Sequence, residues 1–152
     1  MVPLIILFGT LGVLFLINKF LLGGKLSFSF MGRVAMTAML LLAGIAHFIY
    51  FEPMVAMMPD FVPLKLEIVY FTGVCELLAA AGLLWDQTAK PTSVMLIIFF
   101  IAILPANIMG SLKGVNIPGA EYGPWYLLFR VPLQIFFIWW VYYFCITQNR
   151  EQ

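Results

Sequence analysis

Residues 92–110 have the sequence TSVMLIIFFIAILPANIMG, a stretch of membrane-spanning length without a charged side chain. About 20 apolar residues in a helix cross the ~30 Å hydrocarbon core of a bilayer. Because lipid offers no hydrogen bonds to the backbone, a crossing segment satisfies its own N–H and C=O groups by forming a helix. The stretch therefore predicts a transmembrane helix.

The composition of the whole chain supports this interpretation. Of 152 residues, 64% are hydrophobic and 10% are charged, and the mean hydropathy is +1.05. An ordinary globular domain is about half apolar and about a quarter charged. This composition excludes a soluble enzyme, a nucleic-acid-binding protein and a disordered tail. The net charge of +1 indicates no strongly anionic partner, so the lipid bilayer is the first expected partner.

Four other stretches have similar length and apolarity, which predicts an all-α membrane helical bundle. The expected spans form a single transmembrane domain over residues 1–152, at about residues 3–22, 33–50, 67–85, 92–110 and 125–146. The first stretch lacks the basic start and the small-residue cleavage pattern of a signal peptide, so we interpret it as a retained span.

The distribution of basic residues between the loops predicts the orientation. One set of loops contains Lys19, Lys25, Arg33, Lys90 and Arg150, and the other contains Lys65 and Lys113. Because basic residues favour cytoplasmic loops, this difference places the N-terminus outside and the C-terminus in the cytoplasm.

Five polar residues fall inside the expected spans, where polar groups are costly and mark functional sites. They are His47, Glu76, Asn107, Arg130 and Gln134. With a rise of about 1.5 Å per residue, all five are expected between the midplane and the outer surface, on four helices. Ionisable and amide groups are not expected in the inner half of the last four spans, which disfavours a transporter or proton path.

Two of these residues share a local pattern with glycine. Gly44 precedes His47 by three residues, and Gly73 precedes Glu76 by three. This spacing places each glycine on the same helix face as the ionisable group, where a neighbouring backbone can approach closely. The pattern favours a shared site between helices.

The other three residues also have suggestive surroundings. Arg130 and Gln134 are four residues apart and therefore share a helix face. Pro105 precedes Asn107 by two residues and is expected to kink the helix and open a niche there. Because an unpaired charge in lipid is expensive, we expect Glu76 and Arg130 to pair or to share a hydrogen-bond network.

Each residue also has a purely structural interpretation. A Glu76–Arg130 pair could fix helix register, and His47 could be a hydrogen-bonded packing residue. Asn107 could cap the carbonyl that Pro105 leaves without a partner, and Gln134 could join two helices. The convergence of all five at one depth favours a ligand-binding or proton-handling site.

Other kinds of chemistry find little support. Cys75 and Cys145 are expected at different depths and no C-x-x-C motif occurs, which argues against a thiol–disulfide enzyme. With a single histidine, His47, neither a bis-histidine haem nor a metal site is expected. Nucleotide-binding glycine loops are also absent from the sequence. The cofactor therefore stays open.

Five short motifs resemble the DoxX-like family of small integral membrane proteins. They are Gly44-Ile-Ala-His47-Phe48, Met58-Pro59-Asp60-Phe61-Val62-Pro63, Thr72-Gly73-Val74-Cys75-Glu76-Leu77, Pro105-Ala-Asn107-Ile108 and Arg130-Val-Pro132-Leu133-Gln134. The resemblance covers about residues 33–145 and implies a four-helix core in the bacterial inner membrane, to which the first span is an addition. Relatives in that family are linked to membrane oxidoreductase complexes, including the membrane subunit of thiosulfate:quinone oxidoreductase. Others, in animals, assist the assembly of ion-channel subunits.

Two functional hypotheses follow. In the first, a pocket in the outer half binds a quinone-like or other amphipathic molecule, as part of an oxidoreductase system with a membrane or periplasmic redox partner. His47 and Glu76 would exchange protons as the catalytic residues, while Asn107, Arg130 and Gln134 would bind the ligand. In the second, the protein is a non-enzymatic scaffold or assembly factor whose polar layer fixes helix packing. The sequence leaves enzymatic activity and homo-oligomerisation open.

Overall fold

The computed structural model describes residues 2–112 and 125–147, with side chains for residues 2–109 and 131–147. This part of the chain contains six α-helices, one π-helical turn and no strand. The elements are α1 (Val2–Phe20), α2 (Phe28–Ile49), α3 (Phe51–Met57), α4 (Lys65–Gly82), α5 (Asp86–Leu112), α6 (Trp125–Val141) and η1 (Tyr142–Thr147).

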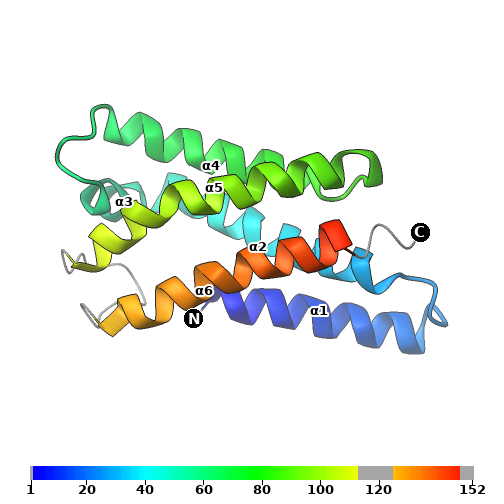
Figure 1. Cartoon of the computed structure of the whole chain (residues 1–152). Helices are drawn as coiled ribbons and strands as arrows, with labels where there is room; N and C mark the ends of the chain where they lie inside the picture. Colours follow the sequence, from blue (N-terminus) through cyan, green and yellow to red (C-terminus); the bar gives the residue numbers. More distant parts are fainter. Residues whose placement is uncertain (1, 113–124, 148–152) are drawn as a thin grey trace.

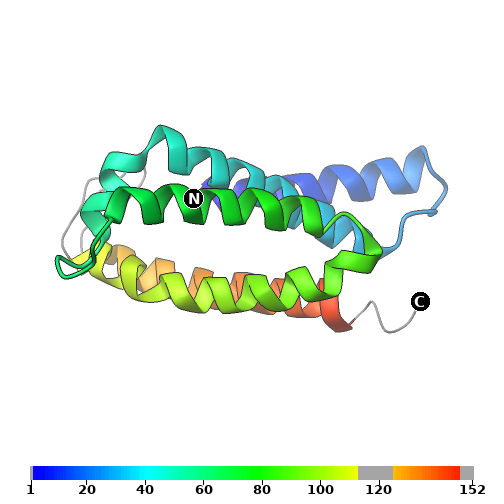
Figure 2. The same cartoon turned by 90° about the horizontal axis from the view of Figure 1, so that it is seen from above.

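The long helices run along a common direction in two groups (Figures 1 and 2). Helices α1, α2 and α4 lie on one side, and α5 and α6 lie on the other. Helix α2 contacts α1, α4, α6 and η1, and it therefore occupies the centre of the bundle. Its residues Ala35, Met36 and Leu40 have no exposed surface and pack in the main hydrophobic core.

Among the described residues, three helices are long and apolar enough to cross a membrane, so the all-α architecture is confirmed and is compatible with a membrane helical bundle. They are Val2–Phe20, Phe28–Ile49 and Asp86–Met109, and a shorter apolar helix covers Val131–Thr147. Helix α4 is also largely apolar but includes the charged residues Lys65, Glu67 and Glu76. The count of five spans therefore stays a prediction.

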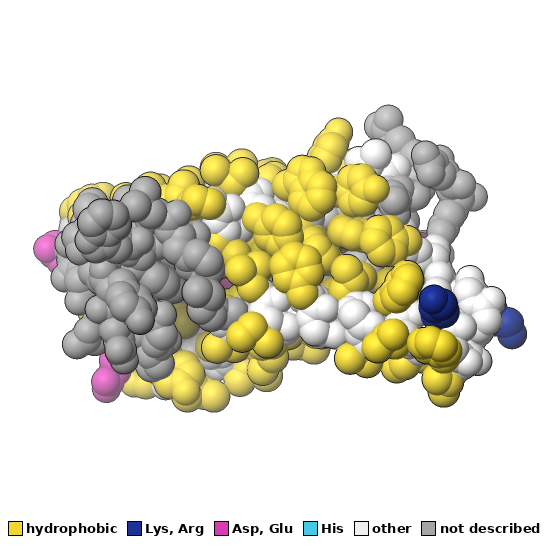
Figure 3. Space-filling view, turned by 90° about the horizontal axis from the view of Figure 1, so that it is seen from below, with side chains coloured by type: hydrophobic (Ala, Val, Ile, Leu, Met, Phe, Trp, Pro, Cys, Tyr) yellow, Lys and Arg dark blue, Asp and Glu magenta, His cyan; other side chains and the backbone are white. Residues whose placement is uncertain are grey.

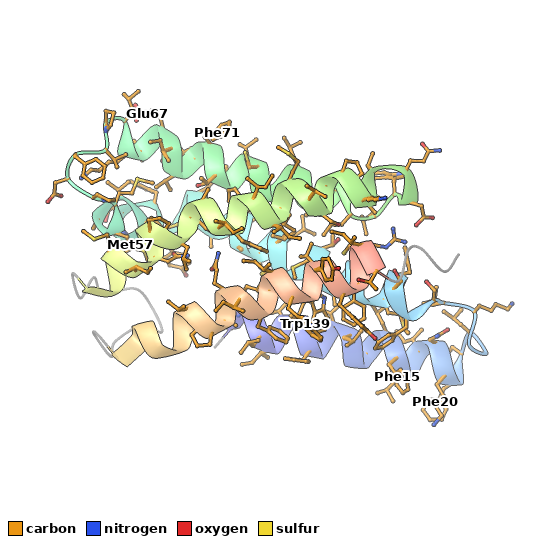
Figure 4. All side chains as sticks on the ribbon, viewed as in Figure 1. Phe15, Phe20, Met57, Glu67, Phe71 and Trp139 are labelled. Atoms are coloured by element: carbon orange, nitrogen blue, oxygen red, sulfur yellow. The ribbon has the colours of Figure 1, made fainter. Side chains whose placement is uncertain are left out.

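The outer surface of the bundle suits lipid. Figure 3 shows hydrophobic side chains over the middle of one face, with basic and acidic groups at opposite ends of the view. Phe15 and Phe20 on α1 and Phe71 on α4 point away from the bundle (Figure 4), and between half and three quarters of their surface is exposed. Large apolar side chains exposed on several helices need an apolar surrounding.

Two helices begin before the spans that were expected from the apolar stretches. Helix α2 begins at Phe28 instead of residue 33, because the Ser27 side chain accepts a hydrogen bond from the Phe30 N–H and caps the helix. Helix α5 begins at Asp86 instead of residue 92, so Pro91 lies inside it. Proline costs less near a helix start than deep inside, because the first N–H groups of a helix have no helical partner.

Candidate functional site

Two glycines bring α2 and α4 into close contact. A Cβ atom added to Gly44 would lie 2.9 Å from the Leu77 side chain and 3.1 Å from the Gly73 carbonyl oxygen. A Cβ atom added to Gly73 would lie 2.7 Å from the His47 Cβ atom and 3.2 Å from the Gly44 carbonyl oxygen. The predicted close approach of a neighbouring backbone is present, and each glycine provides it for the other. We call this contact the α2–α4 seam.

The seam places His47 beside Glu76. The Nδ1 atom of His47 lies 3.4 Å from the Oε2 atom of Glu76, and the side chains are 17% and 6% exposed. Both groups face the interior of the bundle rather than lipid. A buried carboxyl beside an imidazole is neutral overall in two forms: acid beside imidazole, or carboxylate beside imidazolium. The pair can therefore hold a proton on either partner.

The hydrogen bonds of this pair leave one carboxyl oxygen without a partner. His47 Nδ1 lies 2.9 Å from the Ala43 carbonyl oxygen, which can only accept, so Nδ1 donates its hydrogen to Ala43. The Glu76 Oε2 atom is buried and has no hydrogen-bond partner among the residues that the structure describes. A buried polar atom without a partner is uncommon and costs about 1–3 kcal/mol.

Aromatic rings surround the α3 end of the seam. The Phe48 and Tyr70 rings are stacked with their centroids 5.5 Å apart. The Phe51 ring, on α3, lies 5.9 Å from the Tyr70 ring at a tilted angle. Phe48 directly follows His47, and an added Gly73 Cβ atom would lie 3.2 Å from its ring. The carboxyl–imidazole pair therefore has an aromatic cluster next to it, formed by Phe48, Phe51 and Tyr70.

Asn107 and Gln134 form a second pair, between α5 and α6. The Nδ2 atom of Asn107 donates to the Oε1 atom of Gln134 over 3.4 Å. The Nε2 atom of Gln134 donates to the Phe100 carbonyl oxygen over 2.8 Å, and Gln134 is only 6% exposed. This geometry matches the interpretation of Gln134 as a residue that joins two helices. It brings two of the expected ligand-binding residues together.

Arg130 belongs to α6, but its side chain lies outside the described residues. The expected contact between Glu76 and Arg130 therefore stays a prediction. The partner that the structure gives to Glu76 is His47, from α2. Four of the five expected site residues thus form two pairs, His47 with Glu76 and Asn107 with Gln134.

One buried charge was missed by sequence reasoning. Arg33 was expected at the end of a span, yet it is 2% exposed and its Nη2 atom pairs with the Asp86 carboxylate. The Nε and Nη1 atoms of Arg33 are buried and have no hydrogen-bond partner within the described residues. Helix α2 begins before Arg33, so this ionisable residue lies within the helix and not at its end. Ser27 as a helix cap was the sequence signal that could have shown this.

The contacts along α2 and its neighbours follow an antiparallel order. Arg33 pairs with Asp86, and the Thr37 hydroxyl donates to the Ala80 carbonyl oxygen over 3.2 Å. His47, further along α2, meets Glu76. The Arg33–Asp86 pair therefore lies at the α4–α5 turn, and the His47–Glu76 pair lies toward α3.

The two cysteines are free thiols, Cys75 partly exposed and Cys145 buried. Cys75 directly precedes Glu76 on α4, and Cys145 lies in η1. Their separation on different elements agrees with the expectation that they do not form a disulfide.

The model of a known protein family matches most of the chain. The family described as Domain of unknown function (DUF8561) matches residues 36–145. The chain belongs to this family. The DUF8561 region begins within α2 and ends in η1, so it contains both polar pairs, whereas α1 and Arg33 precede it. Comparisons with curated proteins and with solved structures return no match.

Proposed function

We propose that this DUF8561 protein binds a quinone-like amphipathic molecule beside His47 and Glu76, as a membrane subunit of an oxidoreductase system. The observation that carries the proposal is the buried Oε2 atom of Glu76, which has no hydrogen-bond partner in the described part of the chain. A bound polar head would supply the missing partner. The neighbouring rings of Phe48 and Tyr70 suit a flat aromatic head.

A quinone exchanges protons when it is reduced or oxidised, and the His47–Glu76 pair can hold a proton. Reduction of a quinone to a quinol consumes two electrons and two protons. His47 and Glu76 would exchange protons with the oxygen atoms of the ligand, because either member of the pair can hold a proton. Asn107, Arg130 and Gln134 would bind and orient the ligand. A redox partner protein would supply or take the electrons.

The proposal includes a membrane topology. The described helices α1, α2, α4, α5 and α6 would form five spans, with the N-terminus outside in a bacterial inner membrane. The resemblance to DoxX-like proteins supports a four-helix core built from α2, α4, α5 and α6. The family match, which begins at residue 36, is consistent with α1 as an addition to that core.

Equilibrium binding of a short-chain benzoquinone, in both redox states, to purified protein in detergent tests the proposal. We expect Glu76→Leu and His47→Leu to weaken binding of the preferred state by about tenfold or more, because each removes a hydrogen-bonding partner from a buried site. Thr37→Val is the matched control, since Thr37 is a buried polar residue of α2 outside the site. Unchanged binding in both leucine variants contradicts the proposal.

A scaffold or assembly factor is the second candidate, and the close contact of Gly44 with Gly73 favours it. Small residues at a helix interface allow tight packing, which needs no ligand. The Asn107–Gln134 pair also joins two helices directly. Under this function, the same leucine variants would lower the unfolding stability or the recovery of a partner, and neither redox form would bind to the wild-type protein.

A further inference from the structure

The guanidinium group of Arg33 is buried with more hydrogen-bond donors than it has described acceptors. The Arg33 side chain is 2% exposed, and its Nη2 atom donates to one carboxylate oxygen of Asp86. The Nε and Nη1 atoms have no hydrogen-bond partner among the described residues. The Phe30 ring lies 5.6 Å from the guanidinium and stabilises its charge, but it supplies no oxygen acceptor. Two nitrogen atoms of this group therefore lack an acceptor.

The chemistry of arginine determines the kind of partner that these atoms require. The guanidinium stays protonated at physiological pH, and its nitrogen atoms donate hydrogen bonds without accepting any. Its planar fork suits two oxygen atoms of one carboxylate or phosphate group. Asp86 occupies one side of this fork with a single oxygen. An anion that presents two oxygens would therefore satisfy the fork better than Asp86 does.

Asp86 can be replaced on the guanidinium. Its side chain is 79% exposed, so the carboxylate can turn into solvent and stay hydrated. Arg33 would then be a buried charge without a counter-ion, which is strongly unfavourable. An anion that reaches the α4–α5 turn can therefore take the place of Asp86.

The surrounding charges favour such an anion. The α1–α2 link and the α4–α5 turn lie at the same end of the bundle (Figure 1), which we call the basic end. Within the described part of the chain, basic residues predominate at this end and acidic residues predominate at the end with α3. The basic end carries Lys19, Lys25, Arg33, Lys90 and Asp86, and the other end carries Glu52, Asp60, Glu67 and Lys65. The basic end therefore attracts anions.

The predicted orientation indicates where the anion comes from. The excess of basic residues places this end on the cytoplasmic side, where anionic phospholipids give the membrane a negative surface. Arg33 is the sixth residue of α2, about 8 Å along the axis from the first residue. With the start of α2 at the membrane surface, this depth is within reach of a lipid headgroup.

We propose that Arg33 binds the phosphate group of an anionic phospholipid at the basic end, with two phosphate oxygens on the guanidinium fork in place of Asp86. A free phosphate ion offers the same oxygens, so the experiment includes it as a second source. The inference is independent of the ligand proposed beside His47 and Glu76, which lie toward α3.

Equilibrium binding of a short-chain phosphatidylglycerol to purified protein, in uncharged detergent at about 0.15 M salt, tests the site. We expect Arg33→Gln to weaken binding by about tenfold or more, because it removes the fork that holds the phosphate. Lys90→Gln is the matched control, since it removes the same charge from an exposed position one turn after Asp86. Its effect should be small, because salt screens exposed charges. Equal weakening in both variants overturns the assignment to Arg33.

Two further variants test the geometry of the contact. Arg33→Lys keeps the buried charge and loses the fork, so we expect it to bind several-fold more weakly than the wild-type protein. Asp86→Asn removes the competing carboxylate, so we expect tighter binding. Wild-type affinity in Arg33→Lys overturns the two-oxygen contact, and unchanged or weaker binding in Asp86→Asn overturns the replacement of Asp86. If Arg33→Gln does not fold, these two variants decide.

Two other ligands distinguish the sources of phosphate. Phosphatidylcholine of the same chain length adds a positive choline group, so we expect it to bind more weakly at the basic end. Equally tight binding overturns the preference for an anionic lipid. Inorganic phosphate at matched ionic strength should also bind more weakly than phosphatidylglycerol. If it binds as tightly and depends on Arg33, the lipid is overturned as the source, and binding of none of the three ligands overturns the phosphate site.

Discussion

Two pairs of ionisable side chains connect α2 to its neighbours, and they differ in how exposed they are. In the Arg33–Asp86 pair, the arginine side chain is 2% exposed and the aspartate side chain is 79% exposed. In the His47–Glu76 pair, the exposed fractions are 17% and 6%. The first pair therefore lies at the edge of the bundle, and the second lies inside it.

This difference separates the roles of the two pairs. If the Arg33–Asp86 pair opens, Asp86 remains exposed, whereas Arg33 is left as a buried charge, so the pair holds the start of α5 against α2. Glu76 is buried, and its Oε2 atom has no hydrogen-bond partner among the described residues. Burial of a polar atom without a partner lowers stability, and under the proposed function a bound ligand offsets this cost.

The largest expected effect comes from separating the helices beside His47 and Glu76. We expect Gly73→Ala to lower the free energy of unfolding by about 1–3 kcal/mol, because its Cβ atom would overlap the His47 Cβ atom and the Gly44 carbonyl oxygen. Denaturation in mixed detergent micelles measures this change. Gly9→Ala is the control, since nothing lies within 4 Å of a Cβ atom there. Equal stability of the two variants would show that the seam is loosely packed.

The next effect concerns the Arg33–Asp86 pair. We expect Asp86→Asn to lower the free energy of unfolding by about 1 kcal/mol at low salt and by less at high salt, because the carboxylate is exposed. The effect of Glu76→Gln should be insensitive to salt, because Glu76 is buried. Unfolding at two salt concentrations measures both. The same salt dependence in both variants would remove the contrast between the pairs.

The smallest expected effect concerns the amide pair of α5 and α6. We expect Gln134→Leu to lower the free energy of unfolding by about 0.6 kcal/mol, which is typical of a hydrogen bond between membrane helices. Asn107→Leu, which removes the opposite partner, should have a similar effect. A loss several times larger in either variant, in the same unfolding assay, would show that this pair contributes more to stability than the His47–Glu76 pair.

The sequence predicted the parts of the fold that depend on local pattern. Long apolar stretches showed where helices form, and the three-residue spacing from Gly44 to His47 and from Gly73 to Glu76 indicated a close helix contact. That contact is present, and the two glycines face one another across it. These features could be predicted because they follow from helix periodicity.

The pairing of polar groups could not be predicted in the same way. The expected contact of Glu76 with Arg130 stays a prediction, and the sequence did not single out His47, the partner that the structure describes for Glu76. The partner of a polar side chain depends on which helices become neighbours. The sequence of a single helix does not specify its neighbours. The burial of Arg33 was missed because the apolar stretch starts later than the helix, whose first residue is determined by the Ser27 cap.

The most direct test of the account identifies the small molecules that co-purify with the protein. Mass spectrometry of extracts from wild-type protein, Glu76→Leu and the control Thr37→Val would measure quinone and quinol per protein molecule. The account predicts that these molecules are enriched with the wild-type protein and with Thr37→Val, and are depleted with Glu76→Leu. Equal amounts in all three, at the level of the surrounding membrane lipid, would contradict a ligand site at Glu76.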